Sequence, residues 1–297
     1  MIPQQSKKVF LVINKFAGHR KCKIKLIDKI INFLQKNNCT VSFEYTQYHG
    51  HAKSIATEAV RKGFQLVVAF GGDGTVNEVA QGLLGTPAIL GIIPAGSGNG
   101  FARELGISMN LIASAHTLID GTVKNTDVCL FNNKPFLCTC GIGFDARVAD
   151  QMNKSTSRGF FRYIQLTAKE SLTFKPFGVR LLLDDRYFEE KIFMVTFANI
   201  SQFGNHAIIA PQAKIDDGLI DVIVIKPFRK IWLPILAILL FTRYFPRLPI
   251  VEYIQVRKAE ILQTDADSFH LDGEPQELIL PSKMTIHSGK IPVMSAK

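Results

Sequence analysis

The sequence predicts a chain of two parts: an α/β domain with an open, mostly parallel sheet, followed by a β-rich domain built as an antiparallel sandwich. In the first part, apolar runs alternate with helical patterns at short intervals, which is typical of a parallel sheet covered on both faces. After about residue 122, the segments become strands joined by short polar turns. The chain has 297 residues, enough for two separate cores. We place the domains at residues 1–125 and 126–297, with a last strand able to pack back on the first domain.

The elements of the first domain follow from hydrophobic periodicity. Apolar, β-branched runs at residues 8–14, 66–70 and 88–94 predict buried strands, and residues 41–45 alternate as in a further strand. Helices are predicted over residues 52–62, ended by Gly63, and over about 76–83. A first helix is predicted from apolar residues at helical spacing: Ile24, Ile27, Ile31 and Leu34.

The second domain is predicted to contain one helical stretch, roughly residues 159–173, among many strands. The strands are joined by Asp-Asp, Asp-Gly, Gly-Glu-Pro and Ser-Gly-Lys turns, which favour antiparallel pairing. Cys138 and Cys140 lie in one of these strands. They fit two small apolar residues, or a fragment of a metal site whose other ligands are not evident.

Charge and cysteine content narrow the class of protein. The formal net charge is +10, which favours acidic partners such as nucleic acid, an anionic membrane or phosphorylated small molecules, or reflects only a solvated basic surface. The odd count of five cysteines without a Cys-x-x-Cys pair indicates a reducing compartment. We see no signal peptide, and the longest apolar run, residues 231–241, is too short to span a bilayer. These features predict a cytoplasmic protein.

Two glycine-rich turns follow the third and fourth predicted strands of the first domain. They read GGDGT at residues 71–75 and PAGSGNG at residues 94–100. The carboxyl edge of a parallel sheet is where ligands bind, and amides at a helix start favour phosphate. Asp73 would repel bare phosphate unless a divalent cation such as Mg²⁺ joined them. The alternative is a pair of tight turns, and neither loop matches the Walker A or dinucleotide motif.

Together, the segments GGDGTVNEV and PAGSGNGFAREL resemble the diacylglycerol kinase catalytic family, which includes bacterial soluble lipid kinases, sphingosine kinases and ceramide kinases. The shorter GGDGT also occurs in NAD kinases and phosphofructokinases. The resemblance covers nearly the whole chain, from the loop at Asn14 to the segment LDGEP near the end. It implies a Rossmann-like nucleotide-binding domain, a β-rich lipid-substrate domain and an active site in the cleft between them, with ATP as cofactor.

The same resemblance implies which residues contact the nucleotide. They lie at the ends of the first two strands and in both glycine loops: Asn14, Thr46, Gly71, Gly72, Asp73, Gly74, Thr75, Asn77, Gly96 and Ser97. Asp73 is also implied in catalysis, because it would organise Mg²⁺ through water. One departure is visible: Lys15 follows Asn14 where the family usually has proline. This departure affects the detail of the first loop and not its position.

The segment LDGEP contains a pair of acids. From the residues alone it fits an ordinary hairpin, since Asp-Gly is a common turn pair. In the related lipid kinases a matching acid faces the nucleotide and is proposed as general base, which the reaction requires for the proton of the attacking hydroxyl. The resemblance therefore implies Glu274 as the base, assisted by Asp272.

Two further segments carry implied ligands. In bacterial relatives, a segment similar to AKIDDGLID holds a structural Mg²⁺ through two backbone carbonyls and one carboxylate; here these would belong to Lys214, Leu219 and Asp217. The alternative is a plain turn. The segment GIGFDARV is similar to one that contacts the acceptor lipid in sphingosine kinases, which implies Asp145 in substrate binding. The alternative for Asp145 is a helix N-cap.

Residues 226–258 combine an apolar stretch with positive charge. Only Glu252 opposes the cations, which are Lys226, Arg229, Lys230, Arg243, Arg247, Arg257 and Lys258. They flank the apolar run 231–241 and the aromatic stretch that ends it, and Trp232 and Tyr244 suit a membrane interface. The pattern predicts docking on an anionic membrane, or, as the alternative, a core helix with a solvated basic rim.

These observations predict an ATP- and Mg²⁺-dependent lipid kinase, cytoplasmic and peripherally associated with membranes. Diacylglycerol, converted to phosphatidic acid, is the leading acceptor, and a sphingoid base or ceramide is the alternative. An NAD kinase-like enzyme with a soluble substrate is less favoured, because it would give no role to the basic apolar segment. A nucleotide- or membrane-binding protein without turnover is a different class that the motifs leave open. We expect no nucleic-acid partner, and a homodimer stays open.

Overall fold

The computed structural model describes residues 6–17, 24–155, 160–266 and 269–297. It divides the chain into two compact units. Unit 1 comprises Met1–Thr126 and Gly289–Lys297, and unit 2 comprises Asp127–Ser288. Two strands, β5 (Thr122–Phe131) and β16 (Ser282–Ser295), contribute residues to both units.

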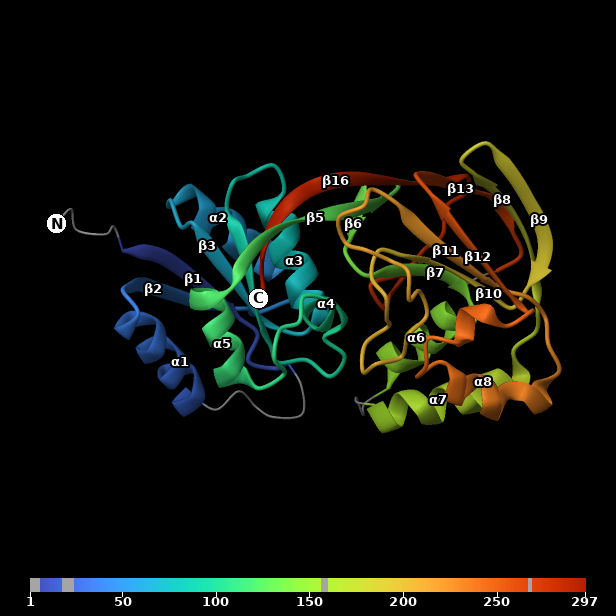
Figure 1. The fold of residues 1–297 in the computed structure, drawn as a ribbon, viewed down its shortest axis with the longest axis horizontal. Helices are drawn as coiled ribbons and strands as arrows, with labels where there is room; N and C mark the ends of the chain where they lie inside the picture. Colours follow the sequence, from blue (N-terminus) through green and yellow to red (C-terminus); the bar gives the residue numbers. More distant parts are fainter. Residues whose placement is uncertain (1–5, 18–23, 156–159, 267–268) are drawn as a thin grey trace. The chain divides into compact units, whose positions relative to one another are not determined.

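Unit 1 is built around a parallel sheet (Figure 1). Its strands lie in the order β2 (Cys39–Tyr45), β1 (Lys7–Ile13), β3 (Leu66–Gly71) and β4 (Ile89–Pro94). The end of β16 joins β4 in parallel, with Val293 opposite Leu90. The predicted open parallel sheet of an α/β domain is therefore confirmed.

Helices cover both faces of this sheet (Figure 1). The helices α1 (Ile24–Lys36) and α5 (Leu111–Asp120) pack together on one face, and α2 (His51–Arg61) and α3 (Asp73–Leu83) on the other. A short helix, α4 (Gly100–Glu104), follows the second glycine loop. The helix α1 buries Ile27, Ile30 and Leu34 against the sheet, whereas Ile24 is 71% exposed. Ile31 also packs on this core while partly buried, so three of the four predicted apolar positions are confirmed and only Ile24 is wrong.

Unit 2 contains two antiparallel layers. One has the order β12 (Val251–Val256), β11 (Ile220–Ile225), β10 (Met194–Ala198), β7 (Thr139–Gly143), β14 (Phe269–Leu271) and β15 (Glu274–Gln276). The other pairs the start of β16 with β13 (Lys258–Thr264), β8 (Phe177–Leu183) and β9 (Arg186–Ile192), and includes β5 with β6 (Lys134–Phe136). Residues from both layers form one core, among them Ile142, Val195, Phe197, Val222, Val179, Leu181, Ile261 and Met284. The predicted antiparallel sandwich is confirmed.

The helices of unit 2 differ from the expectation. The helix α7 (Phe160–Thr173) matches the predicted stretch, but α6 (Phe144–Lys154) was not predicted. Apart from Phe144, its buried apolar residues are Ala146, Val148 and Ala149, two of which are small, so its hydrophobic periodicity is weak in the sequence. The apolar run forms a 3-10 turn, η1 (Lys230–Trp232), continued by α8 (Leu233–Leu239) and followed by η2 (Phe245–Arg247). Figure 1 shows α6, α7 and α8 on one side of this unit.

Candidate functional site

The two glycine loops of unit 1 touch each other through their backbones. The amide of Ala95 donates to the carbonyl of Gly71 at 2.8 Å, which joins the ends of β3 and β4. A Cβ built on Gly96 would lie 2.5 Å from the Cα of Gly72, and one on Gly72 would lie 3.2 Å from the Cα of Gly96. Since backbone atoms meet backbone atoms here, no side chain fits at Gly96 without a shift of the loops.

Asp73 lies beside this contact. It is the first residue of α3, whose N-cap is Gly72. Its Oδ1 accepts a hydrogen bond from the amide of Phe101 at 3.4 Å, and its Oδ2 would be 3.2 Å from a Cβ on Gly98. The carboxylate therefore spans from the first loop to the second, at a helix start where negative charge is favoured.

The strand ends next to the loops hold two more of the predicted residues. The side-chain amide of Asn14 donates to Thr75 Oγ1 at 3.2 Å, and the backbone amide of Asn14 donates to the carbonyl of Phe70 at 2.9 Å. The amide of Thr46 donates to the carbonyl of Ile13 at 2.9 Å. The structure thus brings Asn14, Thr46 and Thr75 to the carboxyl edge of one parallel sheet, and Asn14 contacts Thr75 of the first glycine loop there.

Ser97 and Asn77 occupy different surroundings in the same unit. Ser97 is exposed in the second loop, between the contact glycine Gly96 and the start of α4. Asn77 lies within α3, where its Oδ1 accepts a hydrogen bond from Gln81 Nε2 at 2.7 Å. Their contact with a nucleotide, and that of Gly74, stays a prediction.

Asn99, which sequence reasoning did not single out, shapes the second loop. It has a left-handed backbone (φ 52°) and is the N-cap of α4. Its Oδ1 accepts from the amide of Gly96 at 3.0 Å, and its Nδ2 donates to the carbonyl of the same residue at 2.8 Å. An asparagine between two glycines is a local signal for this conformation, so the residue could have been found from sequence.

Glu78 was also missed, and no local signal points to it. Its carboxylate accepts from the amides of Gly50 at 2.8 Å and Ala52 at 3.0 Å, and so ties the start of α2 to α3. The partners are 28 and 26 residues away in sequence. Glu78 therefore connects the start of α2 to α3, the helix that begins at the first glycine loop.

In unit 2, the segment LDGEP forms the predicted hairpin. The strands β14 and β15 pair around Asp272 and Gly273, both with positive φ (48° and 81°), as a two-residue turn of this kind requires. The Asp272 carboxylate accepts from the amides of Leu137, Cys138 and Thr139 at 3.0, 2.8 and 3.0 Å. Asp272 therefore braces the turn against the start of β7.

Glu274, the first residue of β15, is partly exposed. It follows the braced turn directly, so its backbone position is set by the contacts of Asp272 and Gly273. Its role as a base stays a prediction.

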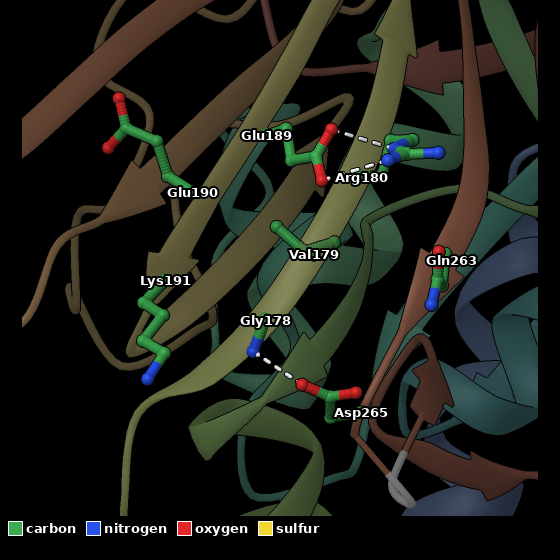
Figure 2. A pocket seen from close by; sticks show the side chains of 8 residues that line it. All are labelled: Gly178, Val179, Arg180, Glu189, Glu190, Lys191, Gln263 and Asp265. Atoms are coloured by element: carbon green, nitrogen blue, oxygen red, sulfur yellow. Dashed lines mark hydrogen bonds and ion pairs between the residues drawn. The ribbon is translucent and has the colours of Figure 1, made fainter.

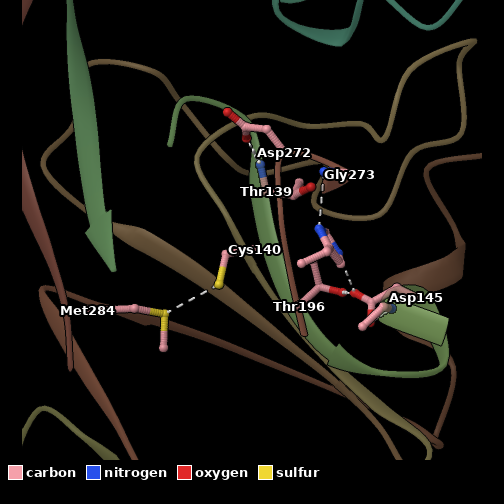
Figure 3. Close-up of polar contacts among 9 residues, drawn as sticks. Thr139, Cys140, Asp145, Thr196, Asp272, Gly273 and Met284 are labelled. Carbon is pink, nitrogen blue, oxygen red and sulfur yellow. Dashed lines mark hydrogen bonds and ion pairs between the residues drawn. The ribbon is translucent and has the colours of Figure 1, made fainter. Parts of the chain in front are cut away.

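Asp145 lies in the first turn of α6 and is 7% exposed. The alternative that it caps this helix is wrong, because the N-cap residue is Gly143. Its Oδ2 accepts from Thr196 Oγ1 at 2.7 Å (Figure 3). The same oxygen lies 3.3 Å from Nε2 of the buried His270. Contact with an acceptor lipid stays a prediction, and the neighbours seen for this carboxylate are protein groups of unit 2.

The residues predicted to hold a second metal lie in the turn before β11. Asp217 Oδ1 accepts from the amide of Leu219 at 3.0 Å, and burial raises the pKa of this carboxyl. The amide of Gly218, the residue between them, donates to Oδ2 of Asp127 at 2.7 Å. Among the described residues, no group of three or more His, Cys, Asp or Glu side chains could hold a metal ion. The predicted site uses only one carboxylate, with carbonyls of Lys214 and Leu219, and stays a prediction.

A buried carboxyl lies in the strand that follows this turn. Asp221 is fully buried in β11, and burial raises its pKa to about 6. Its Oδ1 accepts from Tyr253 and Gln255, whereas its Oδ2 has no hydrogen-bond partner among the described residues. An unpartnered carboxylate oxygen close to Asp217 fits the chemistry of a hard cation.

The apolar run 231–241 does not form a core helix, because no residue of η1 or α8 is buried. Leu236, Leu239 and Leu240 pack on the core, while Ile231 and Ile238 are 80% and 68% exposed. Trp232, Ile235 and Tyr244 are also exposed. No described helix is long and apolar enough to cross a membrane. The exposed face of this segment is therefore apolar, the reverse of an ordinary surface helix.

A hollow of about 250 Å³ lies on β8 and β9 of unit 2 (Figure 2). Opposite charges line it, and Arg180 pairs with Glu189 through two hydrogen bonds of 2.8 and 2.9 Å. Both side chains of this ion pair are exposed and neutralise each other's charge. None of the predicted site residues lines the hollow. We therefore do not assign the chemistry to it.

Family models match both parts of the chain. Residues 8–131 match the model of the diacylglycerol kinase catalytic domain, and residues 138–295 match that of the YegS C-terminal NAD kinase beta sandwich-like domain. A probable lipid kinase YegS-like from Chromohalobacter salexigens is 30% identical over 236 residues, covering 76% of this chain and 75% of its own. A diacylglycerol kinase from Bacillus subtilis is 30% identical over 227 residues, covering 74% of each.

The fold is also found among solved structures. The crystal structure of a putative diacylglycerol kinase from Bacillus anthracis has a TM-score of 0.82 and 25% sequence identity, and the match covers 98% of each chain. Both units of the present chain therefore have a counterpart in a single solved protein.

Proposed function

The chain belongs to the family of diacylglycerol kinase catalytic domains and YegS-like lipid kinases, and on this premise we propose that it transfers a phosphoryl group from ATP to a lipid hydroxyl. We propose diacylglycerol as the acceptor, with phosphatidic acid as the product. A sphingoid base or ceramide is the alternative acceptor, because PAGSGNG is close to the sphingosine kinase form of the loop.

The observation that carries the proposal is the joined pair of glycine loops at the carboxyl edge of the unit 1 sheet. The close approach of Gly72 and Gly96 brings the two loop backbones together at this edge, and glycine there lets a phosphate group come close to the loop amides. Asn14, Thr46 and Thr75 stand beside these loops and supply polar groups for the rest of the nucleotide.

The residues of unit 1 also fit a magnesium ion. Asp73 sets one carboxylate beside loop amides, which is the combination of ligand and phosphate site that Mg²⁺ favours. Bound Mg²⁺ would neutralise charge on the phosphate oxygens during transfer. In unit 2, the carbonyls of Lys214 and Leu219 with Asp217 would hold a structural Mg²⁺.

In unit 2, we assign Glu274 as the general base that accepts the proton of the lipid hydroxyl. It is partly exposed, as a group that meets substrate must be, and it follows a turn held rigidly by Asp272. The three amide contacts of Asp272 give it a supporting role in positioning Glu274.

The proposal is tested by incubating the protein with labelled ATP and a panel of lipids in mixed micelles, with and without Mg²⁺. We expect label in phosphatidic acid only when Mg²⁺ is present, and a loss of about 100-fold or more in kcat for Asp73→Ala, because charge stabilisation on the phosphates is removed. A folded D73A protein that works at the full rate would overturn the assignment. ATP or vesicle binding without transfer to any lipid would favour the non-catalytic alternative.

We also propose that the protein meets its substrate at an anionic membrane surface through η1, α8 and the turn after them. The exposed apolar side chains there are flanked by Arg229, Lys230, Arg243 and Arg247, and residues 226–247 contain no acidic residue. Apolar side chains next to cations suit the boundary between acyl chains and anionic headgroups. This surface would explain an exposed apolar helix face on a lipid-modifying enzyme.

Vesicle sedimentation tests this surface. The double variant Trp232→Ser with Ile238→Ser should lose about tenfold or more in partition to phosphatidylglycerol vesicles, since two large apolar side chains no longer leave water. Tyr187→Ser, which removes an aromatic side chain that is 75% exposed on β9, is the matched control. Equal loss in both proteins would contradict the proposed surface.

A further inference from the structure

Three residues on adjacent strands of the first sheet of unit 2 lie directly opposite one another. Gly141 of β7 pairs with Thr196 of β10 on one side and with His270 of β14 on the other. Adjacent strands are about 4.8 Å apart, so Thr196 and His270 stand about 10 Å apart with the glycine between them. Residues paired in this way point to the same face of a sheet.

The carboxylate of Asp145, from α6, fills the space above the glycine. A Cβ built on Gly141 would lie 2.0 Å from Oδ2 of Asp145, which excludes any side chain there. Thr196 Oγ1 donates to this oxygen at 2.7 Å (Figure 3), and His270 Nε2 lies 3.3 Å from it. Asp145, Thr196 and His270 are 7%, 0% and 3% exposed. These residues therefore form a buried polar network that requires hydrogen-bond donors for its carboxylate.

The other ring nitrogen of His270 reaches the hairpin turn. The backbone amide of Gly273 donates to Nδ1 at 3.2 Å. Only an unprotonated ring nitrogen can accept this bond, so the proton of the neutral ring is on Nε2, which donates to Asp145. His270 thus connects the buried carboxylate to the backbone of the turn.

That turn carries the acid to which we assign the base role. The Asp272 side chain ties the turn to the backbone amides of residues 137–139. The His270 ring accepts a hydrogen bond from the amide of Gly273, within the turn itself. Glu274 follows immediately. The backbone on the N-terminal side of Glu274 is therefore held by two independent side chains.

We propose that His270 is a positioning residue for phosphoryl transfer: oriented by Asp145 and Thr196, its ring holds the Gly273 amide and so fixes the place of Glu274. The inference rests on the proposed function only for the role of Glu274, and the hydrogen-bond chain itself does not depend on it. It also gives Asp145 a task inside unit 2, the orientation of His270.

Two substitutions separate the two contacts of the ring. In His270→Asn, the side-chain oxygen takes the place of Nδ1 and can accept from Gly273, but the contact with Asp145 is lost. In His270→Gln, the longer amide reaches the place of Nε2 and can donate to Asp145, but the acceptor for Gly273 is lost. His287→Gln, at an exposed histidine of β16, is the matched control.

Two readouts are measured on the full chain: the rate of lipid phosphorylation and the hydrogen exchange of residues 269–276. We expect H270Q to lose about 10- to 100-fold in kcat, since small displacements of a reacting group cost this much, while its KM for ATP stays within about twofold. Exchange in residues 269–276 should quicken in H270Q. H270N should recover most of the kcat and of the protection, and H287Q should match the wild type.

The outcomes are distinct. If H270Q and H270N lose kcat equally, the bond to Gly273 does not position the base and the inference is overturned. If H270Q raises the KM for ATP together with a general loss of stability, the role is merely structural and the inference is likewise overturned. If the wild type phosphorylates no lipid, the proposed function fails, and faster exchange in H270Q but not in H270N still establishes that His270 holds the turn.

Discussion

The two candidate sites of this protein are built by different means. In unit 1, the site consists of backbone at two glycine loops, each directly following a buried strand, and the side chains beside it are short. In unit 2, the site consists of side chains that converge from distant segments, such as Asp272 on residues 137–139 and Asp145 on His270. A phosphate requires amides and space, which local sequence can supply. A positioned acid requires a rigid surrounding, which only packing can supply.

The comparison predicts that single substitutions in unit 2 change catalysis without changing nucleotide binding. The largest effect is expected for Glu274→Gln, which removes the proton acceptor and should lower kcat about 10²- to 10⁴-fold. ATP affinity, measured by calorimetry, should not change, because the glycine loops are intact. Glu277→Gln, at the exposed glutamate nearby, is the control. An E274Q protein with wild-type kcat would show that the base lies elsewhere.

A second prediction concerns the brace of the turn. In the wild type, the Asp272 carboxylate accepts hydrogen bonds from three backbone amides. In Asp272→Asn, the side-chain NH₂ group would face at least one of these amides, donor against donor. We therefore expect the free energy of unfolding to fall by about 3 kcal/mol. Urea unfolding measures it. The control is Asp265→Asn, an exposed residue that accepts from the amide of Gly178 at 3.1 Å. Similar losses for both variants would contradict a special role of Asp272.

A third prediction tests the backbone contact of unit 1. In Gly96→Ala, the added methyl meets the Cα of Gly72 at 2.5 Å, so the loops must separate, and we expect ATP affinity to fall about tenfold, or about 1.4 kcal/mol. In Gly98→Ala, the methyl meets only the Asp73 side chain at 3.2 Å, which can move. G98A should therefore bind ATP better than G96A, and the reverse order would argue against the contact.

The smallest effect is expected for Asn99→Ala. It removes the two hydrogen bonds that hold Gly96, but the backbone contact between the loops remains. We expect a loss of about 1 kcal/mol in stability and a few-fold loss, on the order of threefold, in ATP affinity. Fluorescence titration with a nucleotide analogue measures the latter. An effect larger than that of G96A would mean that the asparagine, and not the glycine contact, shapes the loop.

The class of each domain and the positions of the two glycine loops could be predicted from the sequence. Buried β-branched runs make parallel strands, the chain must turn at their carboxyl ends, and glycine in those turns is readable without any partner. The turn at Asp272 and Gly273 was predictable for the same local reason. The face of α1 was predictable in most positions, but the burial of Ile30 and the exposure of Ile24 depend on the fit of the helix to the sheet and not on spacing alone.

Which side chains contact one another depends on the packed fold. Nothing near Asp145 in the sequence points to Thr196 or His270, 51 and 125 residues away, because strand order in the sandwich sets these neighbours. The contacts of Glu78 likewise join residues far apart in the sequence. The exposed apolar face of α8 was also not predictable, because its sequence fitted a core helix equally well. Loops are determined by the residues within them, whereas buried polar networks are determined by register between strands, and register becomes fixed only when the core is packed.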